Sequence, residues 1–413
     1  NVALRYPGTA QAAAGRSMTY REVDEWSSKL ARVLINRGLG AEDLVAVSIP
    51  RSVESVLAVW AVSKTGAAVV PIDPHYPADR IAHMLSDSGA KVGLTLDVER
   101  PNLADDVEWL VVDGPLGEQM IAGVSGAPID AEERVRPLTT AHPAWVIYTS
   151  GTTGLPKGVV ATNAGLASFS VTQAAHYLVK PTSRTLHFAS PSFDASMLEL
   201  FLAVATGATM VIVPPGVYGG DELAQVMRIG RVTHAFVTPA ALATVDPAGL
   251  PDLRVVVTGG DACSPALVDQ WSHGRSMFNA YGPTETTVVA TLTGPLSSDV
   301  PVTIGKPMRG AATVLLDSRL QPVPIGVAGE LYVSGVGLAR GYHARATITA
   351  ERFVADPNGV AGERMYRTGD LARWNGEGEL EYLGRREADG LHWAGNVGSG
   401  IGDGDVERLL SAL

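Results

Sequence analysis

Residues 144–158 read AWVIYTSGTTGLPKG, and this stretch is the most informative part of the sequence. The apolar run 144–148 predicts a buried strand, and it leads directly into Ser, Thr and Gly residues closed by Lys157. Glycines let backbone N–H groups approach an anion, and neighbouring hydroxyl groups can donate to the same oxygens. A polar surface turn is the alternative interpretation. A buried strand that ends in such a loop favours an α/β protein with a phosphate site.

The loop supplies a set of candidate phosphate-binding residues. They are Thr149, Ser150, Gly151, Thr152, Thr153, Gly154 and Lys157. The loop is not a Walker P-loop, because that motif needs GxxxxGK followed by Ser or Thr. Here Lys157 comes three residues after Gly154 and is followed by glycine.

The flanking sequence alternates between helix and strand patterns. Helices are predicted at 26–37, 52–64 and 77–88, and strands at 44–49, 68–72 and 92–96. This alternation predicts parallel sheets covered on both faces. Residues 101–138 contain more turn formers and acids, which favours a looser hairpin and connector. After residue 300 short strands dominate and indicate a small β-rich subdomain.

Composition excludes several classes of protein. The 413 residues exceed one compact core, so packed subdomains are expected. The net charge of −11 argues against a nucleic-acid partner. No apolar run has the ~18 residues of a membrane span. The single cysteine, Cys263, allows no internal disulfide, so we expect a cytoplasmic location.

Seven motifs follow one another in an order that resembles the adenylate-forming superfamily, which includes acyl- and aryl-CoA synthetases, luciferases and nonribosomal peptide synthetase adenylation domains. They are MTYREV at 18–23, KTGAAVVPIDPHYP at 64–77, the phosphate loop, SFDAS at 192–196, NAYGPTE at 279–285, GELYVSGVGLARGY at 329–342 and YRTGDL at 366–371. The resemblance covers roughly residues 15–385, and SFDAS together with NAYGPTE favours the peptide-synthetase branch.

The resemblance implies an ATP- and Mg²⁺-dependent ligase that activates an amino acid as an aminoacyl-adenylate. The product would be loaded onto the phosphopantetheine arm of a carrier protein, and a small activating protein is a further candidate partner. The implied α/β fold has two helix-flanked β-sheets plus a small distorted β-barrel subdomain. The implied domains are a core at 1–384, and a hinge with the remnant of a C-terminal subdomain at 385–413.

Nucleotide contacts are assigned by the same resemblance. Lys157 and the loop would hold the β- and γ-phosphates, Thr284 would touch the α-phosphate, and Glu285 would bind Mg²⁺. Hard cations prefer such oxygen ligands. The ribose and adenine would contact Asn279, Tyr281, Gly282, Asp370 and Arg385, with Gly259 and Gly260 allowing close backbone approach.

Asp194 resembles the aspartate that pairs with the α-ammonium group of an amino-acid substrate. A helix N-cap is the alternative role, because an apolar helical run follows it. The resemblance places eight residues around the substrate side chain: Ala195, Leu198, Val237, Val257, Gly259, Ala280, Val288 and Val289. None is charged, so a charged substrate would lose hydrogen bonds on burial. The small residues among them leave room for a large substrate side chain. We therefore rank Tyr, Trp and Phe first as substrates, and Leu, Ile and Val second.

The pattern departs from the family after Arg385. No position matches the lysine that the family carries in its C-terminal subdomain, and the region 386–413 is Gly-rich. Glu387 or Asp389 is the hinge candidate, and 404–410 resembles part of the following helix. We therefore expect weak adenylation by this fragment. An acyl- or aryl-CoA ligase and a non-catalytic, degenerate adenylation domain remain alternatives.

Overall fold

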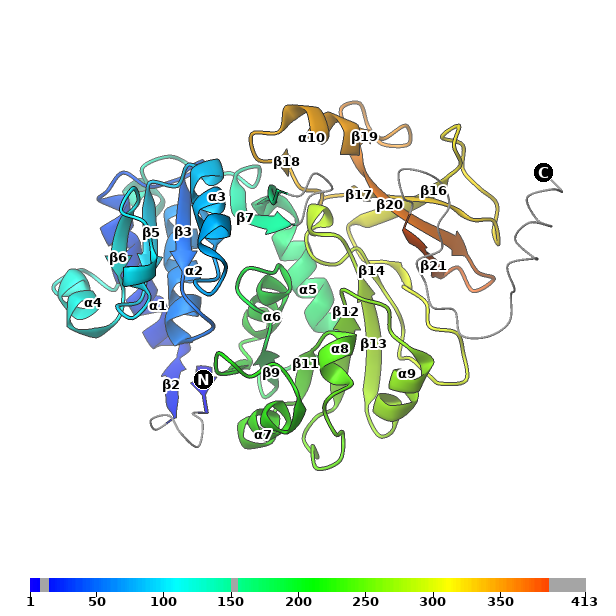
Figure 1. Ribbon diagram of the computed structural model, residues 1–413, viewed down its shortest axis with the longest axis horizontal. Helices are drawn as coiled ribbons and strands as arrows, with labels where there is room; N and C mark the ends of the chain where they lie inside the picture. Colours follow the sequence, from blue (N-terminus) through cyan, green and yellow to red (C-terminus); the bar gives the residue numbers. More distant parts are fainter. Residues whose placement is uncertain (8–14, 150–154, 386–413) are drawn as a thin grey trace.

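The structure is a computed structural model that describes residues 1–7, 15–149 and 155–385. Within these residues the strands form three sheets, which Figure 1 shows from the blue N-terminal part through green to the orange and red C-terminal part. The α/β class and the presence of two large sheets confirm the sequence prediction. Among the described residues no helix is both long and apolar enough to cross a membrane.

The first large sheet is built mainly from residues 44–162 and contains β7 and β8, the two strands on either side of the phosphate loop. In order, its strands are β18 (Gly341–Tyr342), β8 (Lys157–Thr162), β7 (Pro143–Thr149), β4 (Ala68–Pro71), β3 (Leu44–Ser48), β5 (Val92–Thr95) and β6 (Glu108–Val111). The strands from β7 to β6 are parallel, whereas β8 and β18 are antiparallel to their neighbours.

The second large sheet has the order β15 (Lys306–Pro307), β14 (Thr291–Leu292), β13 (Ser276–Tyr281), β12 (Val255–Gly259), β11 (His234–Phe236), β9 (Arg184–His187), β10 (Thr209–Ile212), β1 (Val2–Tyr6) and β2 (Arg16–Thr19). Its central strands are parallel. Their carboxyl ends therefore share one edge, which is where open α/β sheets bind ligands.

The third sheet confirms the small β-rich subdomain. It is an antiparallel half-barrel of β16 (Ala311–Leu316), β17 (Gly329–Gly335), β20 (Arg364–Trp374) and β19 (Phe353–Ala355), with β21 (Leu380–Arg385) paired to β20. Strands β14, β15 and β18 also come from this part of the sequence, but they extend the two larger sheets. The C-terminal third thus joins both large sheets.

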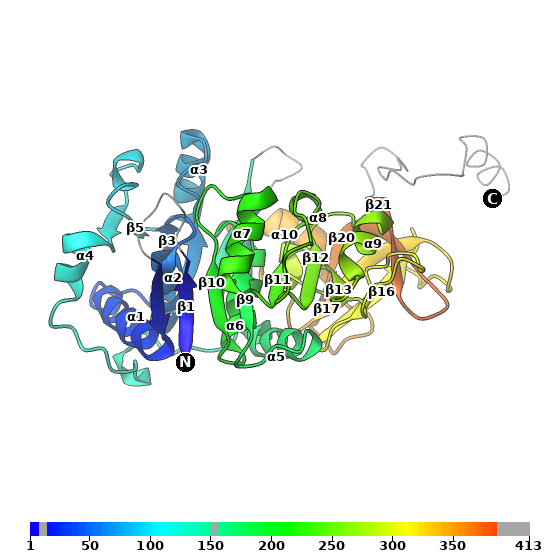
Figure 2. The same ribbon diagram turned by 90° about the horizontal axis from the view of Figure 1, so that it is seen from below.

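Helices cover both faces of the large sheets. The first sheet carries α1 (Tyr20–Ile35), α2 (Val53–Thr65), α3 (Ala78–Ser88) and α4 (Gly114–Ile121). On the second sheet, α5 (Leu166–His176) and α6 (Ala195–Val204) pack on one face, and α7 (Gly220–Gly230), α8 (Pro239–Leu242) and α9 (Pro265–Ser272) on the other (Figure 2). The short α10 (Ala346–Arg352) follows β18.

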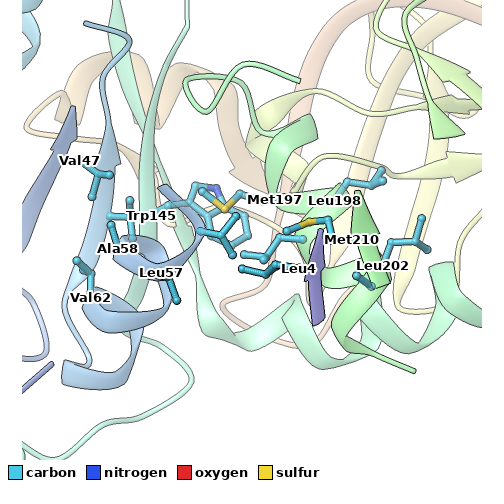
Figure 3. Packing of buried hydrophobic residues seen from close by; sticks show 14 of the residues in the cluster. Leu4, Val47, Leu57, Ala58, Val62, Trp145, Met197, Leu198, Leu202 and Met210 are labelled. Atoms are coloured by element: carbon cyan, nitrogen blue, oxygen red, sulfur yellow. The ribbon is translucent and has the colours of Figure 1, made fainter. Parts of the chain in front are cut away.

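One apolar core joins the two large sheets. Figure 3 shows Leu57 and Ala58 of α2 facing Met197 and Leu198 of α6, with Trp145 of β7 beside them. All five side chains are buried. Because this core spans both sheets, the strands β7 and β8 and the strand ends of the second sheet are held in one fixed arrangement.

Two local predictions need correction. Residues 101–138 form no hairpin: β6 adds a parallel edge strand and α4 follows it. β6 reads EWLV and lies among acidic and turn-forming residues, so the sequence around it shows no clear strand pattern. The first helix begins at Tyr20, not at residue 26, because Thr19 and Glu22 form a reciprocal capping box.

Candidate active site

Strands from all three sheets bring the predicted residues together. Lys157 begins β8, Glu285 lies in the 3₁₀ turn η4 (Thr284–Thr286) directly after β13, and Asp370 lies in β20. Five residues of the predicted phosphate loop lie outside the described residues: Ser150, Gly151, Thr152, Thr153 and Gly154. The hinge candidates Glu387 and Asp389 lie outside them as well.

Glu285 is the centre of a buried polar cluster. Its side chain is 7% exposed, and the Tyr342 hydroxyl donates to Oε1 at 2.6 Å. The Tyr366 hydroxyl lies 3.2 Å from that of Tyr342. Burial, reinforced by the Glu285 charge, raises the pKa of both tyrosines, so both remain protonated donors. The sequence reasoning missed these two tyrosines, although both stand inside quoted motifs.

Lys157 lies near the Glu285 carboxylate but just outside hydrogen-bonding distance. Its Nζ is 3.7 Å from Glu285 Oε1 and 3.9 Å from the centre of the Tyr342 ring. Burial lowers the pKa of Lys157, and the Glu285 charge opposes that shift. Across the ladder, Thr149 pairs with Lys157, and the buried Thr149 hydroxyl has no partner among the described residues. A cation and an unpaired hydroxyl therefore flank the loop.

Asp370 is held by two of the residues predicted to contact the nucleotide. Tyr281 donates its hydroxyl to Asp370 Oδ2 at 2.5 Å, and Arg385 Nε is 3.8 Å from Oδ1. Burial raises the pKa of Asp370, while the Tyr281 bond and the Arg385 charge lower it. The Tyr281 ring also lies 6.2 Å from that of Tyr382. The result is an acceptor next to a flat aromatic surface.

Asn279 is buried in β13, and its amide group has one partner. Its Nδ2 donates to the Thr303 carbonyl at 2.8 Å, which fixes the amide plane and directs Oδ1 away from that bond. An amide oxygen is an acceptor, which suits an exocyclic amino group such as that of adenine.

The three predicted glycines, at 259, 260 and 282, suit their positions for different structural reasons. A Cβ at Gly259 would lie 2.5 Å from the Ala280 carbonyl oxygen, and one at Gly282 would lie 2.6 Å from Val288 O. Gly259 is therefore required by strand packing, and Gly282 by the close approach of the backbone at residues 288–290. Gly260 has φ +81° and open space around its missing Cβ, so it alone of the three presents a left-handed backbone to free space.

Asp194 stands at the N-terminus of α6 but does not cap it. Its side chain makes no capping hydrogen bond. Burial raises the pKa of Asp194 to about 6, the nearby Thr284 lowers the pKa of the carboxyl group, and the nearby Glu285 charge adds to the rise. The structure therefore brings Asp194 beside the turn that carries Thr284 and Glu285.

The loop that carries Asp194 is anchored by a buried network that sequence reasoning missed. Glu199, one turn further along α6, is 1% exposed and accepts from His187 Nδ1 at 2.7 Å. It also accepts the N–H groups of Phe188 and Ala189, each at 3.0 Å. A charged residue in the apolar run ASMLELFLAV was the available signal.

The predicted pocket needs one correction. Ala195, Leu198, Val257, Ala280, Val288 and Val289 all belong to or pack against the core between the two sheets. Val237 instead packs in the separate core under α7–α9, whereas Phe236 belongs to the first core, with its ring 3.3 Å from the position of a Gly259 Cβ. Neighbouring residues along an extended chain point to opposite faces, so Phe236, and not Val237, lies on the same side as the other predicted pocket residues.

The residues present fit Mg²⁺ and a nucleotide. The described residues contain no group of three or more metal-ligating side chains, so a cation at Glu285 would take further oxygens from phosphates. Thr149 and Lys157 could contact those phosphates, and Asn279, Tyr281 and Asp370 could contact a nucleoside. ATP would supply the adenylyl group that activates a carboxylate, with pyrophosphate as the leaving group.

Comparisons with known proteins agree with this geometry. A family model described as "AMP-binding enzyme" matches residues 1–343. The chain is 44% identical over 95% of its length to the probable non-canonical nonribosomal peptide synthetase CymA of Salinispora arenicola, covering 5% of that protein. It is 43% identical over 90% of its length to Novobiocin biosynthesis protein H of Streptomyces niveus, covering 62% of that protein.

A solved structure extends the likeness to the fold. The N-terminal subdomain of Klebsiella oxytoca NpsA in complex with 3-hydroxybenzoyl-AMSN has a TM-score of 0.81 and 30% identity, covering 93% of each chain. The chain belongs to the AMP-binding enzyme family, the adenylate-forming enzymes that its motif order indicates.

Proposed function

We propose that this chain activates an amino acid with ATP as an aminoacyl-adenylate, the first step of carrier-bound peptide synthesis. The observation that carries the proposal is the position of Asp194 beside Thr284 and Glu285. A carboxylate at that point can pair with an α-ammonium group while the substrate carboxylate faces the phosphates. Charge-assisted hydrogen bonds of this kind are the stronger ones in proteins.

The reaction brings two anions together, so charge neutralisation and positioning are the catalytic work. Lys157 would neutralise phosphate charge, and Glu285 would hold Mg²⁺. Asp370 and Arg385 would hold the ribose, and Tyr281 and Asn279 the adenine ring. These roles combine the family resemblance with the distances described above.

The pocket favours a large apolar or aromatic side chain. Its lining is uncharged, and Gly259 and Ala280 contribute little volume. Phe236 adds a ring face, and aromatic pairs contribute ~0.5–1.5 kcal/mol beyond their burial. We therefore propose Tyr, Trp or Phe first and Leu, Ile or Val second.

The test is binding of aminoacyl-sulfamoyl-adenosine analogues, measured by calorimetry and supported by amino-acid-dependent pyrophosphate exchange. The aromatic analogues should bind most tightly, and Asp194→Asn should weaken them by about tenfold or more because a charged partner is lost. Tightest binding of a Lys, Asp or Ser analogue would show that the pocket assignment is wrong.

A second candidate is activation of an aryl acid, because the NpsA structure holds 3-hydroxybenzoyl-AMSN. An aryl acid lacks the α-ammonium group, so its analogue should bind this chain weakly and be insensitive to Asp194→Asn. Tighter binding of a benzoyl analogue than of any aminoacyl analogue would favour this second candidate.

We also propose a carrier-protein partner and a cytoplasmic location. One related structure is an artificially fused adenylation–PCP di-domain, which pairs such a domain with a carrier. The single cysteine is compatible with a reducing compartment. Transfer of the radiolabelled amino acid to a phosphopantetheinylated carrier tests the partner, and a small activating protein would raise the rate of that transfer.

A further inference from the structure

Tyr342 touches both charged side chains of the phosphate site, and each through a different part of its structure. Its hydroxyl donates to Glu285 Oε1 at 2.6 Å, within the short range typical of bonds to a carboxylate. Its ring face lies 3.9 Å from Lys157 Nζ, well inside the range of a cation–π contact.

The backbone fixes this arrangement. Tyr342 pairs with Val159 in the β18–β8 ladder, and Lys157 is two residues before Val159, on the same face of β8. The Ala339 N–H, just before β18, donates to the Glu285 carbonyl at 2.8 Å. The segment that carries Tyr342 therefore contacts the backbone of Glu285 and lies beside Lys157.

Without Tyr342, the two charges would be expected to meet. Lys157 Nζ and Glu285 Oε1 are 3.7 Å apart, slightly too far for a direct hydrogen bond, and both side chains are largely buried. In a low-dielectric site such a pair attracts strongly. A direct ion pair between Lys157 and Glu285 would compete with a cation for the carboxylate and with a phosphate for the ammonium group.

We propose that Tyr342 is a positioning residue that keeps Glu285 and Lys157 apart, so that the carboxylate stays available to a divalent cation and the ammonium group to phosphate. The proposal rests on the proposed use of Mg²⁺ and ATP. In this proposal the Tyr342 hydroxyl holds the Glu285 carboxylate, and the ring face holds the Lys157 ammonium group.

The experiment measures the Kd of AMPPNP by calorimetry, once with saturating Mg²⁺ and once with a chelator. The ratio of the two Kd values is the metal enhancement. Tyr342→Phe keeps the ring and removes the hydroxyl, so the enhancement should fall about tenfold or more, as for partners that orient metal ligands. The Kd measured with chelator should change less than twofold.

A matched control is Tyr177→Phe. The Tyr177 hydroxyl is also buried, but it has no hydrogen-bond partner among the described residues and lies in the core beside Phe278. This variant should keep the full metal enhancement. Thermal melting of both variants checks that each is folded.

A double-mutant cycle separates positioning from a general structural effect. In a Glu285→Gln background, Tyr342→Phe should no longer change the enhancement, because the carboxylate it positions is gone. Undiminished enhancement in Tyr342→Phe, equal weakening of both Kd values, or an unchanged effect in the Glu285→Gln background would each overturn the inference. Absence of any metal enhancement in the unaltered protein would instead overturn the proposed Mg²⁺ role, and the inference with it.

Discussion

Asp370 has one carboxylate oxygen bonded to Tyr281 and the other facing Arg385 at 3.8 Å. A vicinal diol can donate to both oxygens, and two lost hydrogen bonds cost ~1–3 kcal/mol. Asp370→Ala should therefore raise the Kd for ATP about tenfold or more, measured by calorimetry. An unchanged Kd would refute the ribose role. The matched control is Arg373→Ala: Arg373 lies further along the same strand as Asp370, and its replacement breaks an exposed ion pair with Glu381.

A second prediction at the level of single residues is that the affinity for the amino acid depends on pH through Asp194. Burial raises its pKa to about 6, so the carboxylate is charged above that pH and neutral below it. An α-ammonium group pairs with the charged form, so affinity for the amino acid should be constant above pH 7 and fall up to about tenfold per unit below pH 6. Calorimetry from pH 5 to pH 8 measures this, with ATP affinity as the reference. A flat amino-acid profile in the unaltered protein would contradict the role, and Asp194→Asn should be flat.

At the scale of elements, Glu199 connects α6 to the loop after β9. The carboxylate accepts two backbone N–H groups and His187, so a Glu199→Gln amide would place an NH₂ group against donors. We expect the melting temperature to fall and the KM for the amino acid to rise about tenfold, with the KM for ATP unchanged, because breaking a buried charged network costs several kcal/mol. An equal rise in both KM values would indicate a general structural effect and not positioning of Asp194.

Arg51 shows how the elements of the two large sheets are joined. It precedes α2 on the first sheet and donates to the carbonyls of Val213 and Pro214, which follow β10 on the second. It also donates to the Phe188 carbonyl in the loop before Asp194. These contacts are between residues far apart in sequence, and no local pattern predicts them.

At the scale of the whole molecule, the proposed pocket predicts that substrate choice depends more on Phe236, at the end of β11, than on Val237, which follows that strand. Phe236→Ala enlarges the space beside Gly259 and should change the ratio of affinities for Trp and Leu analogues by about tenfold, the effect of a few methylene contacts. Val237→Ala is the matched control, because its side chain lies in the other core. It should lower stability by ~1–3 kcal/mol and leave the ratio unchanged.

An equal change of the ratio in both variants would contradict the corrected pocket. Gly259→Leu is unsuitable for this purpose, because any Cβ there would meet the Ala280 carbonyl oxygen at 2.5 Å. A loss of activity in that variant would report a disrupted strand pair rather than a changed pocket.

The sequence by itself determined many of the helices and strands of this protein. The helix and strand periods around residues 44–96 predict elements that the structure contains, because each pattern depends on near neighbours. Thr149, Lys157, Glu285 and Asp370 were identified from motifs, and the fold brings Lys157 and Glu285 within 3.7 Å.

Tertiary structure alone decided what surrounds those residues. Tyr342 and Tyr366 become partners around Glu285 because strands from two sheets meet there. Phe236 rather than Val237 packs in the core between the two sheets because strand register sets the face. A one-residue shift in register exchanges the two faces of a strand, and a motif read along the chain carries no information on that shift. The short edge strand β6 was missed for a related reason, since its place depends on pairing with β5 and not on its own four residues.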